Sequence, residues 1–356
     1  MARCAGILMP ITSLPTPYGI GTIGKEAYEF ADFLKASGQK IWQLLPVGPT
    51  SYGDSPYQSF STYAGNPYMI DLDTLVEEGY ISKNDIKDRD WGDDPEKVDY
   101  EKIYNARFDV LYSAFSNFSK CAGEKDTRAF EAFIKENADW LENYALYMAV
   151  KKSFQMQAWT QWPDEDIRLR KPKAVAQYKE KLQYEIRYWM FVQYLFFKQW
   201  EKFKSYVNSL GILIVGDIPI YVAMDSADTW SNPEVFWLDK DRNPVCVAGC
   251  PPDYFSADGQ LWGNPLYNWA RHESTHYDWW IKRVRFSLEL YDAVRIDHFR
   301  GFDTYYAIPY GAPNARKGEW RQGRACGCGA RCCALCRARP LWQRIWARCS
   351  KACARC

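Results

Sequence analysis

The chain has 356 residues, of which 47% are hydrophobic and 17% are aromatic. This length fits one large domain with insertions or two ordinary domains, and the apolar content allows a sizeable core. The formal net charge is +1, but residues 1–322 carry 37 Lys and Arg against 44 Asp and Glu, a net charge of −7. An acidic body gives no reason to expect nucleic acid as a partner.

Cysteine usage and hydropathy bear on the cellular compartment. Only Cys4, Cys121, Cys246 and Cys250 lie before residue 323, a scatter typical of a reducing environment and not of a disulfide framework. No apolar run approaches the roughly 18 residues needed to span a bilayer. The apolar stretch that ends at Pro10 is too short for a signal segment. We therefore expect a cytoplasmic protein with no membrane partner.

The first part of the chain, residues 1–71, predicts two buried strands separated by a helix. Residues 6–11 form an apolar run, and residues 25–37 show the apolar spacing of an amphipathic helix that Gly38 ends. Residues 41–46 form a second apolar run, which is typical of a parallel strand covered on both faces. We expect a barrel start with a substrate loop after the second strand.

Residues 72–185 are charged and have helical periodicity, so we expect an inserted helical subdomain there. The next part, residues 186–322, begins with a long helix that leads into a third apolar strand over 212–217. A long loop over 221–275 follows, and then a helix over 279–290 and a fourth strand over 293–297.

Four strand-and-helix units with long excursions after the strands predict an α/β fold. The pattern resembles the N-terminal part of a (β/α)₈ TIM barrel, with a helical insertion after strand 2 and a lid loop after strand 3. An open doubly wound sheet is the structural alternative. The segment Gly19–Gly24 fits a GxGxxG spacing, but its long Pro-rich approach does not support a nucleotide site.

The candidate chemistry lies at the ends of the third and fourth strands. Arg295 and Asp297 are two residues apart on a strand, so both side chains point to the same side, where the guanidinium would keep the carboxylate ionised as a nucleophile. A structural Arg–Asp pair is the alternative. Asp217 ends the third strand in the same way, and its alternative role is to cap the following turn.

Two loops have the composition of a sugar-binding surface. Residues 249–267 and residues 52–61 combine prolines, glycines, aromatic rings and side chains that bind hydroxyls. Rings stack on sugar faces, while carboxylates and amides bind the hydroxyl groups. An ordinary ordered Ω-type loop is the alternative for the first of them.

Together these segments resemble 4-α-glucanotransferase, the amylomaltase or disproportionating enzyme of glycoside hydrolase family 77. The resemblance runs from the start of the chain to Gln322, with the motifs in family order. It is carried by Ser13–Pro15, Trp42–Thr50, Asp54–Ser59, Gly65–Tyr68, Gly216–Pro219, the lid loop 249–267 and Arg295–Phe302.

The resemblance implies a retaining transfer of α-1,4-glucan segments between maltooligosaccharides, with starch- or glycogen-type glucans as substrates. It implies no metal and no organic cofactor. Asp297 would be the nucleophile that forms the covalent glucosyl-enzyme, with Arg295 as its charge partner and His298 and Asp217 as neighbours. The substrate-binding positions that it implies are Ser55, Tyr57, Tyr52, Asp253, Phe255, Gln260, Trp262 and Asn264.

The sequence departs from the family after Gln322. The resemblance implies an acid/base glutamate on a fifth strand and a stabilising aspartate in a later loop, and the chain contains neither. Residues 323–356 hold eight Cys, seven Arg, seven Ala and no acidic residue. A zinc or nucleic-acid module using Cys333 and Cys336 and a basic tail on a shortened protein are alternatives. We favour a frame change, which predicts a non-native, disordered tail.

This departure bears on activity. Glycoside transfer needs a second carboxyl group to protonate the leaving oxygen. We therefore expect the chain as written to be inactive and poorly stable, since half a barrel leaves a strand edge unpaired. A related α-glucan hydrolase, a non-catalytic glucan-binding barrel fragment and a Cys-rich interaction tail on a barrel remnant are the alternative functions.

Overall fold

The computed structural model describes residues 3–50, 53–94 and 96–324. The chain divides into two compact units, each assembled from separate stretches of sequence. The first comprises Met1–Pro49, Ala64–Val150 and Tyr178–Ile214, and the second comprises Thr50–Tyr63, Lys151–Gln177 and Val215–Cys356. The predicted domain limits at residues 71, 185 and 322 stay predictions. The predicted tail, residues 323–356, lies outside the described residues apart from its first two.

The first unit is mainly helical. In chain order it contains β1 (Gly6–Leu8), η1 (Ile11–Ser13), α1 (Lys25–Ala36), β2 (Ile41–Gln43), η2 (Pro67–Met69), α2 (Leu72–Glu77), α3 (Asn84–Lys87), α4 (Tyr100–Cys121), α5 (Glu124–Glu136), most of α6 (Ala138–Ser153) and α9 (Gln183–Ser209), where η marks a 3-10 helix. β1 and β2 pair in parallel, as the sequence predicts, but β1 is not the buried strand expected, since Leu8 is 52% exposed. α1 covers the expected helix 25–37 to within one residue.

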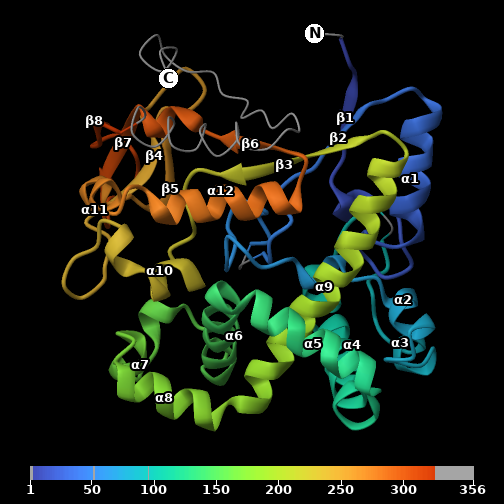
Figure 1. Ribbon diagram of the computed structural model, residues 1–356. Coiled ribbons are helices and arrows are strands. Elements are labelled where there is room, and N and C mark those ends of the chain that lie inside the picture. The colour runs from blue at the N-terminus through green and yellow to red at the C-terminus, as the bar shows by residue number, and fades with distance from the viewer. Residues whose placement is uncertain (1–2, 51–52, 95, 325–356) are drawn as a thin grey trace. The chain divides into compact units, whose positions relative to one another are not determined.

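The helix α9 organises this unit, and α1, α4 and α5 pack against it (Figure 1). It buries a row of aromatic rings. It also carries two buried glutamines, and each side-chain amide makes two hydrogen bonds with the backbone of one residue, as a neighbouring strand would. Gln193 accepts from the Gly65 amide at 2.7 Å and donates to the Gly65 carbonyl at 3.0 Å. Gln199 does the same for Asp71, at 2.7 and 3.1 Å. These four bonds satisfy buried backbone groups of an irregular segment, as buried polar groups require.

The second unit combines two parallel strands with an antiparallel sheet. Its elements are η3 (Trp159–Gln161), α7 (Glu165–Arg168), α8 (Pro172–Lys181, which ends in the first unit), β3 (Leu213–Pro219, which begins there), α10 (Ala227–Ser231), η4 (Pro233–Val235), β4 (Cys246–Cys250), β5 (Gln260–Pro265), α11 (Trp269–Ser274), α12 (Asp278–Leu290), β6 (Ala293–Asp297), η5 (Phe299–Phe302), β7 (Thr304–Pro309) and β8 (Glu319–Gln322).

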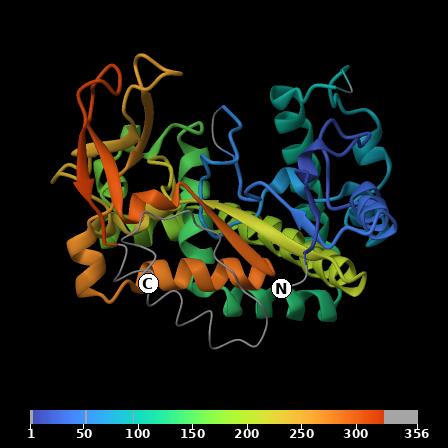
Figure 2. The same cartoon turned by 90° about the horizontal axis from the view of Figure 1, so that it is seen from above.

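β3 and β6 pair in parallel, in a register that runs from Val215 opposite Ala293 to Pro219 opposite Asp297. α12 runs beside β6, as both views show (Figures 1 and 2). Gly216 on β3 lets the Tyr291 ring lie against the strand, because a Cβ at this position would come within 2.1 Å of that ring. Parallel strands joined through a helix confirm an α/β fold.

One expectation about the second unit is wrong. Residues 221–275 are not one long loop, because β4 and β5 pair there as antiparallel strands. After β6, the short 3-10 helix η5 leads to β7 and β8. These four strands form one sheet in the order β5-β4-β7-β8 (Figure 2). The sequence hides this sheet because its strands are short and paired residues lie up to 63 positions apart, as Cys246 and Pro309 do.

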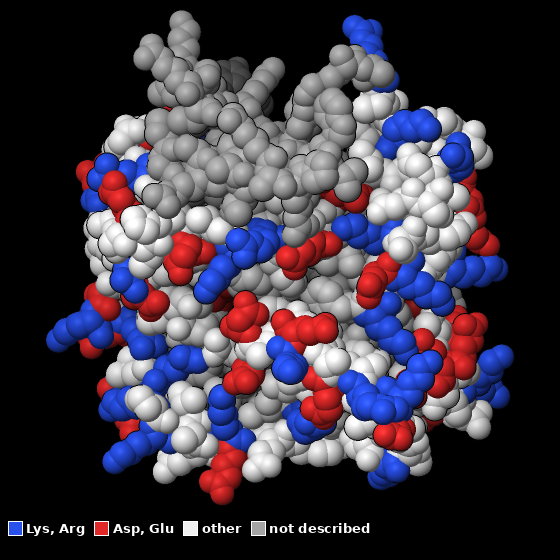
Figure 3. Space-filling view, in the orientation of Figure 1, with Lys and Arg blue, Asp and Glu red and all other residues white. Residues whose placement is uncertain are grey.

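Lys and Arg are interspersed with Asp and Glu over the face shown in Figure 3. Among the described residues, no helix is long and apolar enough to cross a membrane.

Candidate active site

The strand register brings the predicted polar residues together. Asp217 lies opposite Arg295 on the neighbouring strand, and Asp297 lies opposite Pro219, two positions further on. Because β3 and β6 run in parallel, their carboxyl ends meet at one edge, where side chains two residues apart point the same way. The three residues singled out from two separate motifs therefore form one cluster in the second unit.

Arg295 bridges the two carboxylates. Its Nη1 donates to Asp217 Oδ2 at 2.5 Å, and its Nη2 donates to Asp297 Oδ1. Burial alone would lower the pKa of Arg295, but the charges of Asp217 and Asp297 outweigh it and raise that pKa. The guanidinium therefore stays charged and fixes the Asp297 carboxylate in orientation, as a planar fork with several donors does well.

The two carboxylates differ in exposure. The Asp297 side chain is 40% exposed, whereas that of Asp217 is 1% exposed. Burial raises the pKa of Asp217, against the opposing effects of its bonds to Tyr57 and Arg295. Asp217 does not cap the following turn: Oδ2 accepts from both partners, and Oδ1 has no hydrogen-bond partner among the described residues.

Tyr57 reaches this cluster from the loop Thr50–Tyr63, which belongs to the same unit. Its hydroxyl donates to Asp217 Oδ2 at 2.8 Å. Burial, together with that bond, raises the pKa of Tyr57 to about 12. Ser55 shapes the same turn, because its hydroxyl accepts from the Tyr57 amide at 3.4 Å. Tyr52, the remaining predicted contact in this loop, lies outside the described residues.

His298 follows Asp297 in a left-handed backbone conformation, with φ 50° and ψ 42°. This region is uncommon for residues other than glycine, and the imidazole lies near two aromatic rings. Trp262 meets it edge-on at a centroid distance of 4.9 Å, and Tyr221 lies at 6.5 Å. Burial lowers the pKa of His298. The ring is therefore neutral at pH 7 and available as a hydrogen-bonding group.

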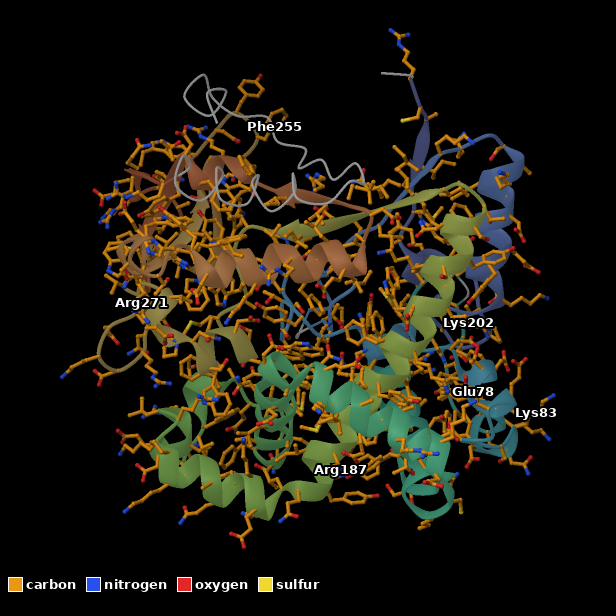
Figure 4. All side chains as sticks on the ribbon, in the orientation of Figure 1. Glu78, Lys83, Arg187, Lys202, Phe255 and Arg271 are labelled. Atoms are coloured by element: carbon orange, nitrogen blue, oxygen red, sulfur yellow. The ribbon has the colours of Figure 1, made fainter. Side chains whose placement is uncertain are left out.

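The predicted lid is a hairpin formed by β4 and β5. Asp253 organises its tip by accepting from the amides of Phe255 and Ser256, both at 2.9 Å. The Phe255 ring is 95% exposed (Figure 4). Gln260 accepts from the Trp262 indole at 3.0 Å.

Asn264 lies in the buried end of the lid, unlike the exposed tip. Its Oδ1 accepts from Gln58 at 3.3 Å, and its Nδ2 donates to the Val222 carbonyl at 2.8 Å. Its amide thus ties the lid strand to the Tyr57 loop, and a direct contact between Asn264 and substrate stays a prediction.

Sequence reasoning missed Tyr221, which is 5% exposed and stacks on Tyr267 as well as facing His298. It also missed Thr62 and Asp228, which bind each other across the unit. The position of Tyr221, four residues after Asp217, could have indicated that it lies near the site. Nothing in the sequence indicated the pairing of Thr62 with Asp228. No group of three or more metal-binding side chains occurs within the described ranges.

Comparison with known proteins identifies the family. A family model described as 4-alpha-glucanotransferase, glycoside hydrolase family 77, matches residues 9–328. The chain belongs to the 4-α-glucanotransferase family. It is 50% identical to a 4-alpha-glucanotransferase of Clostridium butyricum over 316 residues, and 48% identical to one of Thermus thermophilus over 320 residues. The resemblance seen in the sequence motifs is confirmed.

Solved structures agree. The amylomaltase of Streptococcus agalactiae, determined in complex with acarbose, is similar with a TM-score of 0.94 and 44% identity, over 99% of this chain and 71% of that one. The amylomaltase of Corynebacterium glutamicum, at 18% identity and a TM-score of 0.73, shares the fold. The match with the Clostridium 4-α-glucanotransferase covers 88% of this chain but 64% of that protein, and the match with the Thermus protein covers 63% of that protein. The chain therefore spans less than two thirds of the length of these relatives.

Proposed function

We propose that this chain carries the nucleophile and glucan-binding part of a 4-α-glucanotransferase site. The observation that supports it most is the cluster in which Arg295 bridges a buried Asp217 and a half-exposed Asp297. The arrangement gives an oriented and reachable carboxylate paired with a cation, which suits the nucleophile of a retaining glycoside reaction. The substrates are α-1,4-linked maltooligosaccharides, a class that fits the acarbose complex of the related amylomaltase.

In the proposed first step, an oxygen of Asp297 attacks the anomeric carbon of the donor glucan. The bond between that carbon and the glycosidic oxygen breaks, and the oxygen leaves with a proton supplied by a general acid. In the second step, the 4-hydroxyl of an acceptor glucan attacks the same carbon and releases Asp297, while its proton returns to the group that acted as acid. Transfer therefore leaves the linkage and the anomeric configuration unchanged.

The remaining side chains have proposed roles in binding. Tyr57 stacks on the sugar next to the cleaved bond, with Ser55 and Tyr52 on the same loop. Asp217 and His298 support the nucleophile. The lid contacts the acceptor side and excludes water, so that a sugar hydroxyl reaches the intermediate first. The lid residues in this role are Asp253, Phe255, Gln260, Trp262 and Asn264.

We further propose that the 356-residue chain binds glucan without turning it over. Asp217, the other carboxylate of the cluster, is committed to Arg295 and Tyr57, so it is poorly suited to protonate a leaving oxygen. The sequence after Gln322 contains no acidic residue. The chain thus acts as the alternative that the sequence left open, a glucan-binding barrel fragment, until an acid/base carboxyl group is supplied.

One experiment separates the two parts of this proposal. Purified protein is incubated with maltotriose and analysed for glucose and longer glucans, while calorimetric titration with maltoheptaose measures binding. We expect saturable binding that Asp297→Asn retains, with no product. A ladder of longer glucans would overturn the inactivity, and the absence of binding would overturn the glucan site. Free glucose without a ladder would favour a hydrolase.

A further inference from the structure

A buried carboxylate, Asp228, holds the end of the loop Thr50–Tyr63 against the rest of the second unit. The Thr62 amide donates to Asp228 Oδ2 at 2.8 Å, and the Thr62 hydroxyl donates to Asp228 Oδ1 at 2.7 Å. The neighbouring amide of Ala227 donates to the Phe60 carbonyl at 2.8 Å. Three bonds therefore join the end of this loop to the first turn of α10.

Asp228 is placed as a fixed anchor. It is 4% exposed, and it lies on a helix whose preceding residue, Ser226, accepts from the Thr229 amide. A buried carboxylate costs stability unless donors satisfy it, and here the donors come from a loop and not from a cation in contact. Burial raises the pKa of Asp228, while the Thr62 bonds and the charge of Arg283 oppose that rise.

The segment between Tyr57 and Thr62 contains hydrogen bonds among its own residues. The Ser59 hydroxyl donates to the Ser61 carbonyl at 2.8 Å and accepts from the Ser61 amide at 3.3 Å. Ser59 also pairs with Thr50 across the loop. Hydrogen bonds within this short segment make it stiff. A displacement of Thr62 would therefore also displace Tyr57.

We propose that Asp228 is a positioning residue of the glucan site, acting through Thr62. It fixes the loop so that the Tyr57 ring stands beside Asp217 and Asp297, and so sets the affinity for the sugar bound there. This inference rests on the proposed function, in which Tyr57 stacks on the glucan. Thr62 and Asp228 act on the position of Tyr57 and make no contact with the sugar.

The test uses a matched pair of variants in the full chain. Thr62→Val removes the hydroxyl at nearly constant shape, and Thr62→Ser keeps both donors. Calorimetric titration with maltoheptaose gives the dissociation constant Kd. We expect Thr62→Val to raise Kd about tenfold, which corresponds to about 1.4 kcal/mol. Thr62→Ser stays within about twofold of wild type.

A double-mutant cycle separates positioning from general damage. In a Tyr57→Ala background, Thr62→Val should leave Kd unchanged, because the group that it positions is gone. An equal rise of Kd in both backgrounds, or no rise in either, would overturn the inference while leaving the proposed function intact. Failure of the wild-type chain to bind maltoheptaose would overturn the proposed function and this inference with it.

Discussion

At the scale of single residues, one guanidinium serves two carboxylates in different ways. Arg295 contacts a buried Asp217 and a half-exposed Asp297, so the first is a fixed support and the second stays open to a ligand. Nearby, the left-handed backbone of His298 aims its ring toward Trp262, although a side chain in this region carries a conformational cost. The cluster thus places a buried support, the proposed nucleophile and an imidazole within a few residues of two strand ends.

His272, away from this cluster, gives the second unit a pH-dependent stability. Its ring is fully buried, and Nε2 lies 3.0 Å from the Val235 carbonyl, to which it donates, while Nδ1 has no hydrogen-bond partner among the described residues. Burial lowers the pKa of His272 to about 4, against the opposing effects of the Val235 bond and Asp278. The folded state therefore holds this ring neutral.

This difference predicts a loss of stability on acidification. In the unfolded chain His272 has a pKa near 6.5, so between about pH 6.5 and pH 4 the unfolded state binds a proton that the folded state refuses. The contribution is complete above pH 6.5 and falls by about 1.4 kcal/mol per pH unit below it. Between pH 7 and pH 5, wild type should lose about 2 kcal/mol more of its unfolding free energy than His272→Gln, measured with urea.

Gln at this position keeps a donor for the Val235 carbonyl and removes the titrating group. The carboxylates then make the same contribution to the pH dependence of the unfolding free energy in both proteins. Parallel losses in the two proteins would show that His272 is not the responsible group.

At the scale of elements, the antiparallel sheet carries the lid and supplies its rigidity. Val247 on β4, Tyr306 and Ile308 on β7, and Ala315 in the following turn form a buried cluster. Asp258 in the lid turn accepts from Arg316 at 2.8 Å, and its carbonyl accepts from the Ala315 amide at 3.0 Å. The base of the lid is therefore fixed to the β7–β8 turn, while Tyr254 and Phe255 at its tip are almost fully exposed.

Two substitutions on this hairpin sheet should separate stability from binding. Ile308→Ala removes a fully buried side chain and should lower the unfolding free energy by about 2–5 kcal/mol. Phe255→Ala removes an exposed ring and should change it by less than about 0.5 kcal/mol, while weakening maltoheptaose binding. Urea unfolding and calorimetric titration measure the two effects. Marked destabilisation by Phe255→Ala would contradict an exposed lid tip.

At the scale of the whole molecule, the chain crosses between its two units five times, so neither unit is a continuous stretch of sequence. The candidate site nevertheless draws its described residues from the second unit alone, with Tyr57 brought in by a short loop excursion. All of these residues precede Gly323, whereas the last 34 residues contain eight basic residues and no acidic one. The residues of the proposed glucan site and the basic tail therefore lie in separate parts of the sequence.

Removing residues 325–356 tests that separation. The deletion takes away seven basic residues, which changes the formal net charge from +1 to −6. We expect the shortened protein to bind an anion-exchange column at pH 7 that the full chain passes through. Its Kd for maltoheptaose should match that of the full chain. A large rise in Kd would show that the tail contributes to the glucan site.

The sequence by itself determined the family, the α/β class and the identity of the candidate nucleophile. Alternation along a strand places Arg295 and Asp297 on one side. Motifs made of consecutive residues can be recognised without knowing which distant segments they contact. Only the tertiary structure decided that Asp217 binds Arg295 instead of capping a turn, since that depends on the register of β3 against β6. The same holds for the sheet that carries the lid and for the bond between Thr62 and Asp228, 166 residues apart. Such pairings join chain segments that meet only when the core forms. Local secondary-structure propensity therefore does not indicate them.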